Sequence, residues 1–206
     1  MVNRKVELPY FNVGKNYGSN QSWMMDPWMH LGGCAALTTC DVFIYMSMYK
    51  DRKDLYSLKS PSQRELDRKA YSKFAMSVKL YLEPRRTGIK DLKTYTDGVE
   101  LYLKDTDVED IELKSIEGSE PYEKIRMAVE ESINKGMPLA YLMLKHKDKA
   151  FEFFEWHWFI VNGYEDKEDG FYIKAATYGK AHWLNLEKLW DTGYDHKGGI
   201  VLFDFK

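Results

Sequence analysis

The chain has 206 residues and a net charge of −2, because 32 acidic residues slightly outnumber 30 lysines and arginines. No overall positive charge is present to attract phosphates or anionic lipids, so the composition argues against nucleic acid and membranes as partners. Apolar residues form 44% and aromatic residues 15% of the chain. This composition supports a folded core and excludes an intrinsically disordered protein.

Neither a membrane span nor a signal peptide is expected. No segment approaches about 18 uncharged apolar residues, and the first ten residues carry Arg4, Lys5 and Glu7 in place of an apolar stretch. Cys34 and Cys40 are the only cysteines, too few for a disulfide scaffold, so both are expected to be thiols. We therefore expect a cytoplasmic protein, with secretion left open if a leader has been removed.

The first two thirds of the chain predict mainly helices. Leu31 to Tyr49 is apolar nearly all round, which at this length indicates a buried central helix opened by a glycine pair. Three further helices are predicted from capping residues and helical spacing: one from a capping box at Ser60-Pro61-Ser62-Gln63 to about Leu82, one from Gly88 to Lys104, and one from Ser119 to Gly136. Gly98 is expected to weaken the helix that contains it.

After Pro138 the pattern changes to short apolar segments separated by turns. Four of these are rich in β-branched and aromatic residues and predict strands of one antiparallel sheet: Leu139–Leu144, Glu155–Tyr164, Gly170–Gly179 and Gly198–Phe205. Asp107 to Ile116 also alternates between polar and apolar residues. Helices followed by strands indicate a single α+β domain, with a helical lobe over about residues 1–136 packed on a sheet lobe over about 137–206.

Cys34 is a candidate nucleophile because of where it stands. It follows two glycines at the start of the predicted central helix, where unpaired backbone N–H groups and the helix dipole stabilise a thiolate. A thiolate of lowered pKa is the species that attacks a carbonyl carbon. The alternative is a packing role, since free cysteine is among the most commonly buried residues.

His157 is the candidate partner for that thiol. Of the five histidines, it alone lies well inside a predicted strand, in the run Glu155-Trp156-His157-Trp158-Phe159-Ile160-Val161. Strand alternation places its ring on the face of Phe159 and Val161, with both tryptophans on the other face. A rigid strand of this kind aims an imidazole well, although a strand histidine also serves as an ordinary core residue.

The order of a helix-start cysteine, a strand histidine and a following strand resembles the papain-like cysteine peptidases. The closest likeness is to stand-alone relatives of the double-glycine leader peptidases that process bacteriocins. Four segments in order carry it: Gln21 onward to Gly33-Cys34-Ala35-Ala36, Gly88 to Leu103, Lys135 to Leu139, and His157 to Tyr164 leading into Tyr172 to Gly179. The resemblance spans most of the chain and implies the papain-like fold.

Carried onto this sequence, the resemblance implies that Cys34 is the nucleophile and His157 the general base. It implies that Gln21, or Asn20 in its place, supplies a side-chain donor to the oxyanion. Thirteen positions separate Gln21 from Cys34, which is longer than the gap usual in the family. The intervening residues would form an extra loop at the cleft.

A second departure concerns the residue that orients the histidine. The family places Asn or Asp on the strand after the histidine, whereas this chain has Ala175, Ala176 and Thr177. Thr177 is the first candidate because its hydroxyl can bond an imidazole nitrogen, although it stabilises imidazolium less than a carboxylate does. Asn162 and Asn185 are the other candidates.

Two functions of different class follow. The first is hydrolysis of a peptide or related amide through a Cys34 thioester in an open cleft between the lobes, with acyl transfer to an amine as a variant that shares every residue. The alternative is a catalytically weak or inactive module that holds a peptide or small ligand in a cleft lined by aromatic residues. Candidates for that lining are Trp156, Trp158, Tyr164, Tyr172, Tyr178 and Trp183.

No cofactor and no metal is expected for either function. His30, Cys34 and Cys40 lack the paired short spacings of a structural zinc site. The expected partner is a peptide or amide substrate, with no nucleic acid and no membrane, and the sequence carries no indication of an oligomeric state.

Overall fold

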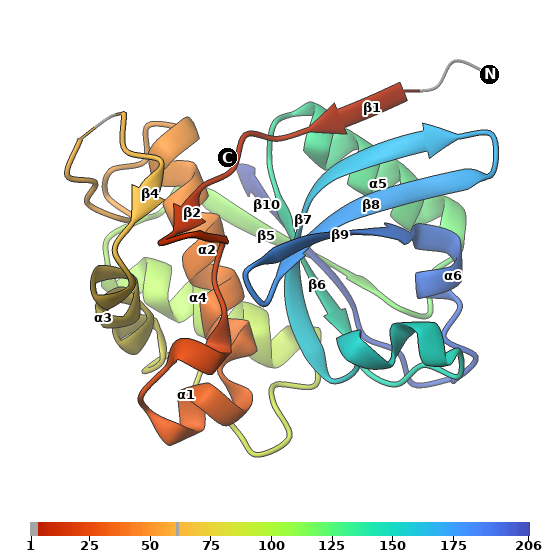
Figure 1. Ribbon diagram of the computed structural model, residues 1–206, viewed down its shortest axis with the longest axis horizontal. Coiled ribbons are helices and arrows are strands. Elements are labelled where there is room, and N and C mark those ends of the chain that lie inside the picture. Colours follow the sequence, from red (N-terminus) through yellow and green to blue (C-terminus); the bar gives the residue numbers. More distant parts are fainter. Residues whose placement is uncertain (1–3, 61) are drawn as a thin grey trace.

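A computed structural model describes residues 4–60 and 62–206 of the chain. Helices α1 to α4 gather on one side and a large antiparallel sheet lies on the other, with α5 and α6 beside the sheet (Figure 1), so the fold is α+β as the sequence predicts. Among the described helices, none combines the length and apolar character that a membrane crossing requires.

The helices comprise six α-helices and two short 3₁₀ helices within the described residues. They are η1 (Gln21–Trp23), α1 (Pro27–Gly32), α2 (Cys34–Tyr49), α3 (Arg68–Val78), α4 (Leu92–Asp105), α5 (Tyr122–Asn134), η2 (Lys149–Phe154) and α6 (Leu186–Trp190). The strands are β1 (Arg4–Glu7), β2 (Asn12–Val13), β3 (Asn16–Tyr17), β4 (Glu65–Leu66), β5 (Ile111–Glu117), β6 (Leu139–Met143), β7 (His157–Lys167), β8 (Gly170–Thr177), β9 (Lys180–Asn185) and β10 (Gly199–Phe205).

The large sheet has the order β5-β10-β6-β7-β8-β9, and β7 is its longest strand. β6 pairs with the first half of β7, over residues 157–161, while β1 pairs with residues 163–166 of the same strand. β2, β3 and β4 form a separate small sheet beside the helices. The four strand segments expected after Pro138 are therefore present as β6, β7, β8 and β10.

Helix α2 lies between α3 and the large sheet (Figure 1). Every residue from Cys34 to Met48 is buried, as the apolar run predicts. Asp41 is the one charged side chain in this stretch, and its carboxylate accepts hydrogen bonds from Tyr10, Ser19 and Tyr71. Burial without such partners would be costly, so these donors let the helix remain in the core.

The predicted helix boundaries need correction at three places. The helix expected from Gly88 begins at Leu92, because Asp91 accepts a hydrogen bond from the backbone N–H of Thr94 and caps α4. The helix expected from the capping box at 60–63 begins only at Arg68, because Asp67 bonds the backbone N–H groups of residues 69 and 70 and starts α3; Pro61 lies outside the described residues. The helix expected from Ser119 begins at Tyr122. Pro121 precedes it, and its fixed φ makes it a natural entry to a helix.

The sheet also recruits chain from before residue 137. β1 pairs with β7 and β5 pairs with β10, so the division of the chain into helices and strands is less sharp than the division expected at residue 137. β9 was not expected either. It pairs with β8 through a turn at Tyr178 and Gly179, which brings the residues after the expected strand back along it.

Gly98 has a packing role that its place in a helix did not reveal. A Cβ at this position would lie 2.4 Å from the backbone oxygen of Tyr81 and 2.7 Å from Cδ2 of Leu82. The absence of a side chain therefore allows α4 to lie directly against the segment that follows α3.

We expect Gly98→Ala to lower the free energy of unfolding by about 1–3 kcal/mol, because the clash with backbone outweighs the better helix propensity of alanine. Urea denaturation measures the change. Glu100→Ala, at an exposed site of the same helix, is the matched control and should shift stability by no more than about 0.5 kcal/mol. An increase in stability for Gly98→Ala would contradict the close packing.

Candidate functional site

Cys34 occupies the first position of α2, directly after the glycine pair. A Cβ at Gly32 would lie 2.2 Å from the backbone oxygen of Arg85, and one at Gly33 would lie 2.5 Å from the backbone oxygen of Met29. Only glycine therefore lets α1 end and α2 begin without a connecting loop. The pair sets Cys34 at the end of the central helix, on the side that meets the sheet.

His157 is the first residue of β7, on the opposite wall. Its neighbour Trp158 points to the helices, where the indole N–H donates to the backbone oxygen of Ile89 (2.8 Å) and the ring stacks on Tyr95 with centroids 4.1 Å apart. This anchor ties the start of β7 to α4. Because side chains alternate along a strand, the His157 ring faces the other way, as predicted.

Thr177 lies against the His157 ring. Ile160 pairs with Ala176 across β7 and β8, so Thr177 projects to the face of Phe159 and His157. Its Oγ1 is 2.6 Å from Nε2 of His157. The expected contact between Thr177 and the imidazole is present, and its catalytic role stays a prediction.

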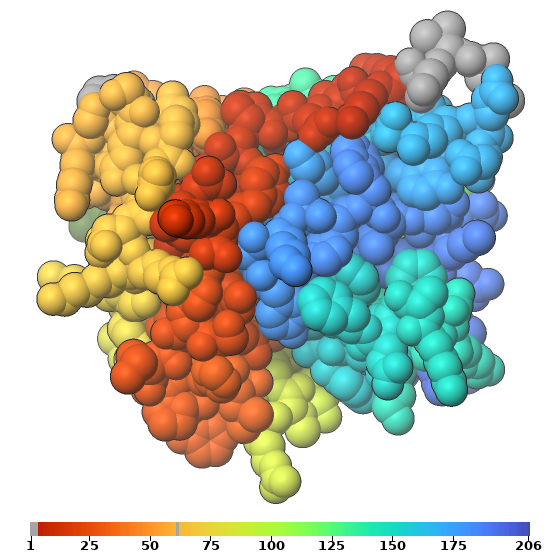
Figure 2. Space-filling view, in the orientation of Figure 1, coloured from red at the N-terminus to blue at the C-terminus, as the bar shows by residue number. Residues whose placement is uncertain are grey.

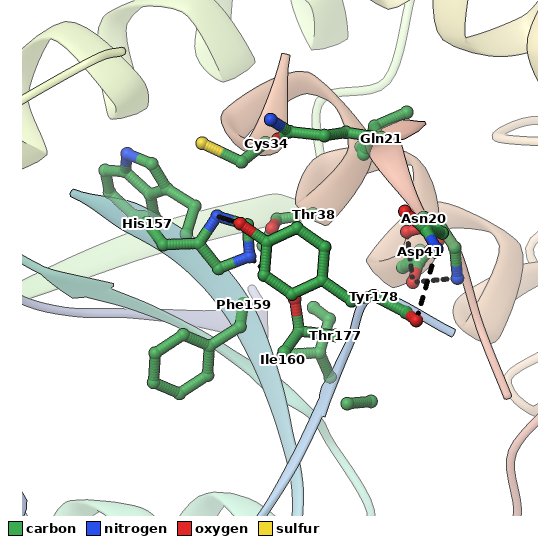
Figure 3. A pocket seen from close by; sticks show the side chains of 14 residues that line it. Asn20, Gln21, Cys34, Thr38, Asp41, His157, Phe159, Ile160, Thr177 and Tyr178 are labelled. Atoms are coloured by element: carbon green, nitrogen blue, oxygen red, sulfur yellow. Dashed lines mark hydrogen bonds between the residues drawn. The ribbon is translucent and has the colours of Figure 1, made fainter. Parts of the chain in front are cut away.

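Tyr178 adds a contact that the sequence did not indicate. Its ring stacks on the His157 ring, with centroids 4.4 Å apart and planes 7° from parallel, and its hydroxyl is 3.3 Å from Nδ1. Figure 3 shows Cys34 on one side of the pocket, with the rings of His157 and Tyr178 next to each other below it. From the sequence, Tyr178 is only one of six aromatic candidates for the lining of a cleft.

Cys34, His157, Thr177, Gln21 and Tyr178 all line one pocket. It lies where the N-terminal segments meet the C-terminal strands, a seam that crosses the face of the molecule in Figure 2. Its free volume is about 10 Å³, roughly enough for one water molecule. The open cleft expected between the lobes is therefore absent from this structure, since Cys34 and His157 are each only 4% exposed and the Tyr178 side chain lines the little space beside them.

Burial determines the protonation states of Cys34 and His157. Burial raises the pKa of the Cys34 thiol, which the backbone N–H groups of Trp158 and Ala35 only partly offset. Burial also lowers the pKa of His157 to about 3. The lowered thiol pKa expected at the helix start is thus absent here, because the loss of water outweighs the helix N-terminus. The closed site holds a neutral thiol and a neutral imidazole.

The two candidate oxyanion donors are both engaged by other groups. Nε2 of Gln21 donates to the backbone oxygens of His30 (3.0 Å) and Leu31 (3.4 Å), at the end of α1. Gln21 lies alongside Cys34 in Figure 3. Asn20 caps η1 through its Oδ1 and donates from Nδ2 to the backbone oxygen of Tyr178. Gln21 is therefore near the thiol, whereas Asn20 holds the turn that closes the site.

The alternatives to Thr177 lie elsewhere. Asn162 is fully buried and donates to the hydroxyl of Tyr17, and Asn185 caps α6. Neither contacts His157. Within the described residues the two cysteines are free thiols, and no group of three His, Cys, Asp or Glu side chains there is arranged to hold a metal ion.

No protein-family model matches this chain, and no curated protein matches it either.

We expect the His157 ring to stay neutral down to about pH 4, because burial holds its pKa near 3. NMR of the ring nitrogens would then show no titration midpoint between pH 4 and pH 8. The unfolded chain binds a proton on this residue below about pH 6.5 and the folded chain does not, so stability is highest above pH 6.5 and falls as the pH approaches 3.

The control for this pH dependence is His157→Gln, which removes the titrating group. The difference in unfolding free energy between the two proteins should change across pH 4 to 6.5. A midpoint for His157 near its ordinary value would show that the ring is hydrated, contrary to the enclosed site.

Proposed function

We propose that the protein is a papain-like cysteine peptidase or amide hydrolase in which Cys34 is the nucleophile and His157 the general base. One observation carries the proposal. A thiol at the N-terminus of a central helix and an imidazole at the start of a strand, 123 positions apart in the chain, line the same pocket. The sequence resemblance assigns the same two residues to the reaction.

The chemistry needs no group beyond those in the pocket and water. The thiol passes its proton to His157, and the sulfur attacks the carbonyl carbon of the amide. The C–N bond breaks, the imidazolium protonates the leaving amine, and a thioester to Cys34 remains. Water, deprotonated by His157, then attacks the thioester, releases the acid and restores the thiol.

The contact of Thr177 with Nε2 leaves Nδ1 as the nitrogen that serves the thiol. A threonine hydroxyl orients the ring but carries no charge, so it stabilises imidazolium less than a carboxylate would. We therefore expect a modest rate.

The backbone N–H of Cys34 is the natural oxyanion donor, because the first N–H groups of a helix lack intrahelical partners. Gln21 is the side-chain candidate because it lies beside the thiol. Its Nε2 donates to the backbone oxygens of His30 and Leu31 at the end of α1, so the weaker of these two bonds must break before the amide can serve the oxyanion.

A non-catalytic binding module is the second candidate. The closed pocket of about 10 Å³ and the uncharged Thr177 favour it, because neither is arranged for catalysis as the site stands. Labelling by a substrate-like electrophile distinguishes the two, since only an activated thiol reacts.

We expect a peptidyl epoxide to label Cys34 at pH 6.5 in an extended incubation, with the site identified by mass spectrometry of the digest. His157→Gln should lower the labelling rate by about 100-fold or more, the range typical of general base catalysis. His146→Gln is the matched control, because His146 is also buried but bonds Lys188 and Asp148 away from this pocket.

Absence of labelling at Cys34, or equal labelling with and without the His157 ring, would overturn the proposal and favour the binding module.

A further inference from the structure

Tyr178 sits in a backbone conformation that its residue type disfavours. It and Gly179 form the two-residue turn between β8 and β9, where Thr177 pairs with Lys180, and their φ angles are 49° and 74°. Such turns favour Asn or Gly at the first position, because a side chain with φ above zero crowds the backbone. A strained residue of this kind is a reason to look for a function.

The Tyr178 side chain is held on both faces. The His157 ring lies on one, 4.4 Å away between centroids, and the Phe153 ring contacts it at 4.9 Å with a 58° tilt. Phe153 belongs to η2 and is 54% exposed. The three rings form a continuous aromatic cluster that begins at the exposed Phe153 and ends at the imidazole, so Tyr178 separates the His157 ring from the solvent on this side.

The hydroxyl of Tyr178 lies next to the His157 nitrogen that the proposed hydrolysis needs. It lies 3.3 Å from Nδ1 of His157, the position that would accept the thiol proton. Burial and the nearby Cys34 raise the pKa of Tyr178 to about 12, so the phenol keeps its proton. Because the two rings are stacked, its hydroxyl covers Nδ1 from above the imidazole plane. In the described part of the chain no hydrogen bond joins Cys34 to His157, and the phenol stands in that place.

Hydrogen bonds connect the Tyr178–Gly179 turn to the N-terminal segment at Ser19 and Asn20. The backbone oxygen of Tyr178 accepts from Asn20, and the N–H of Gly179 donates to the backbone oxygen of Ser19 (2.8 Å). Ser19 in turn donates its N–H and hydroxyl to the Asp41 carboxylate in α2. These bonds cross from the sheet to the helices beside the pocket, so they fix the backbone of the turn that carries Tyr178.

We propose that Tyr178 is an autoinhibitory gate: its phenol closes the pocket of Cys34 and His157, and it must leave the His157 ring before any substrate reaches the thiol. The meaning of the gate for catalysis rests on the proposed function, whereas the closure itself does not. Moving the ring admits water to both side chains, which removes the cause of their shifted pKa values and frees Nδ1.

The test is the rate at which iodoacetamide alkylates Cys34 at pH 6.5, measured by peptide mass mapping. Tyr178→Gly removes the ring and relieves the backbone, and we expect it to raise this rate about tenfold or more. Tyr178→Asn suits the turn equally well and should behave alike, which covers the case in which one variant folds poorly. Tyr178→Phe keeps the ring and should give a smaller rise.

Two controls show whether a change in the alkylation rate of Cys34 is specific to Tyr178. Cys40 is fully buried in the middle of α2 and reports general unfolding in the same digest. Tyr172→Ala changes a tyrosine of the same strand that does not line the pocket, and it should leave the rate at Cys34 unchanged. A rate at Cys34 in Tyr178→Gly and Tyr178→Asn equal to that of the wild type, or an equal rise in Tyr172→Ala, would overturn the gate.

The double variant with Tyr178→Gly and His157→Gln separates the gate from the proposed function. If both hold, the rise at pH 6.5 is lost with the imidazole, because the open thiol then lacks its base. If the rise persists without His157, the gate stands and the proposed function fails. If the peptidyl epoxide labels the wild type and Tyr178→Gly at the same rate, the gate fails and the function stands.

Discussion

The packing of α2 against β7 is the interaction on which the rest of the structure depends. A helix that is apolar all round has no face suited to water, so it must be enclosed by helices on one side and sheet on the other. Each large side chain buried on it contributes about 1.5–3 kcal/mol, and Phe43, Ile44 and Met46 are fully buried. Trp158 completes the arrangement by tying β7 to α4. Together these contacts set Cys34 opposite His157.

The burial that brings Cys34 and His157 into one pocket also disfavours the charged forms that the proposed reaction needs. A thiolate and an imidazolium need water or fixed partners, and the closed pocket supplies neither in sufficient number, so burial raises the pKa of Cys34 and lowers that of His157. An ion pair between them would form only after the phenol of Tyr178 leaves. The proposed hydrolase and the proposed gate are linked in this way, because the charged forms that the first requires depend on the movement that the second describes.

Thr177 contacts one nitrogen of the His157 ring, and Tyr178 contacts the other. Thr177 holds Nε2 from the end of β8, which any catalytic scheme for His157 requires. Tyr178 follows it in the turn and takes Nδ1, which the same scheme requires to be free. A single hairpin therefore carries both side chains that contact the two ring nitrogens of His157.

The sequence alone determined what local periodicity and neighbouring residues control. It predicted the buried central helix, the four later strands and the face on which His157 lies, because strand alternation and chain order suffice for these. The contact of Thr177 with the imidazole was expected only from the resemblance to papain-like peptidases. Only the tertiary structure decided the start of α3 at Arg68, the recruitment of β1, the place of Tyr178 and the direction of the Cys34 pKa. Each of these depends on contacts between segments distant in the chain, and no pattern along the sequence states how much water such contacts exclude.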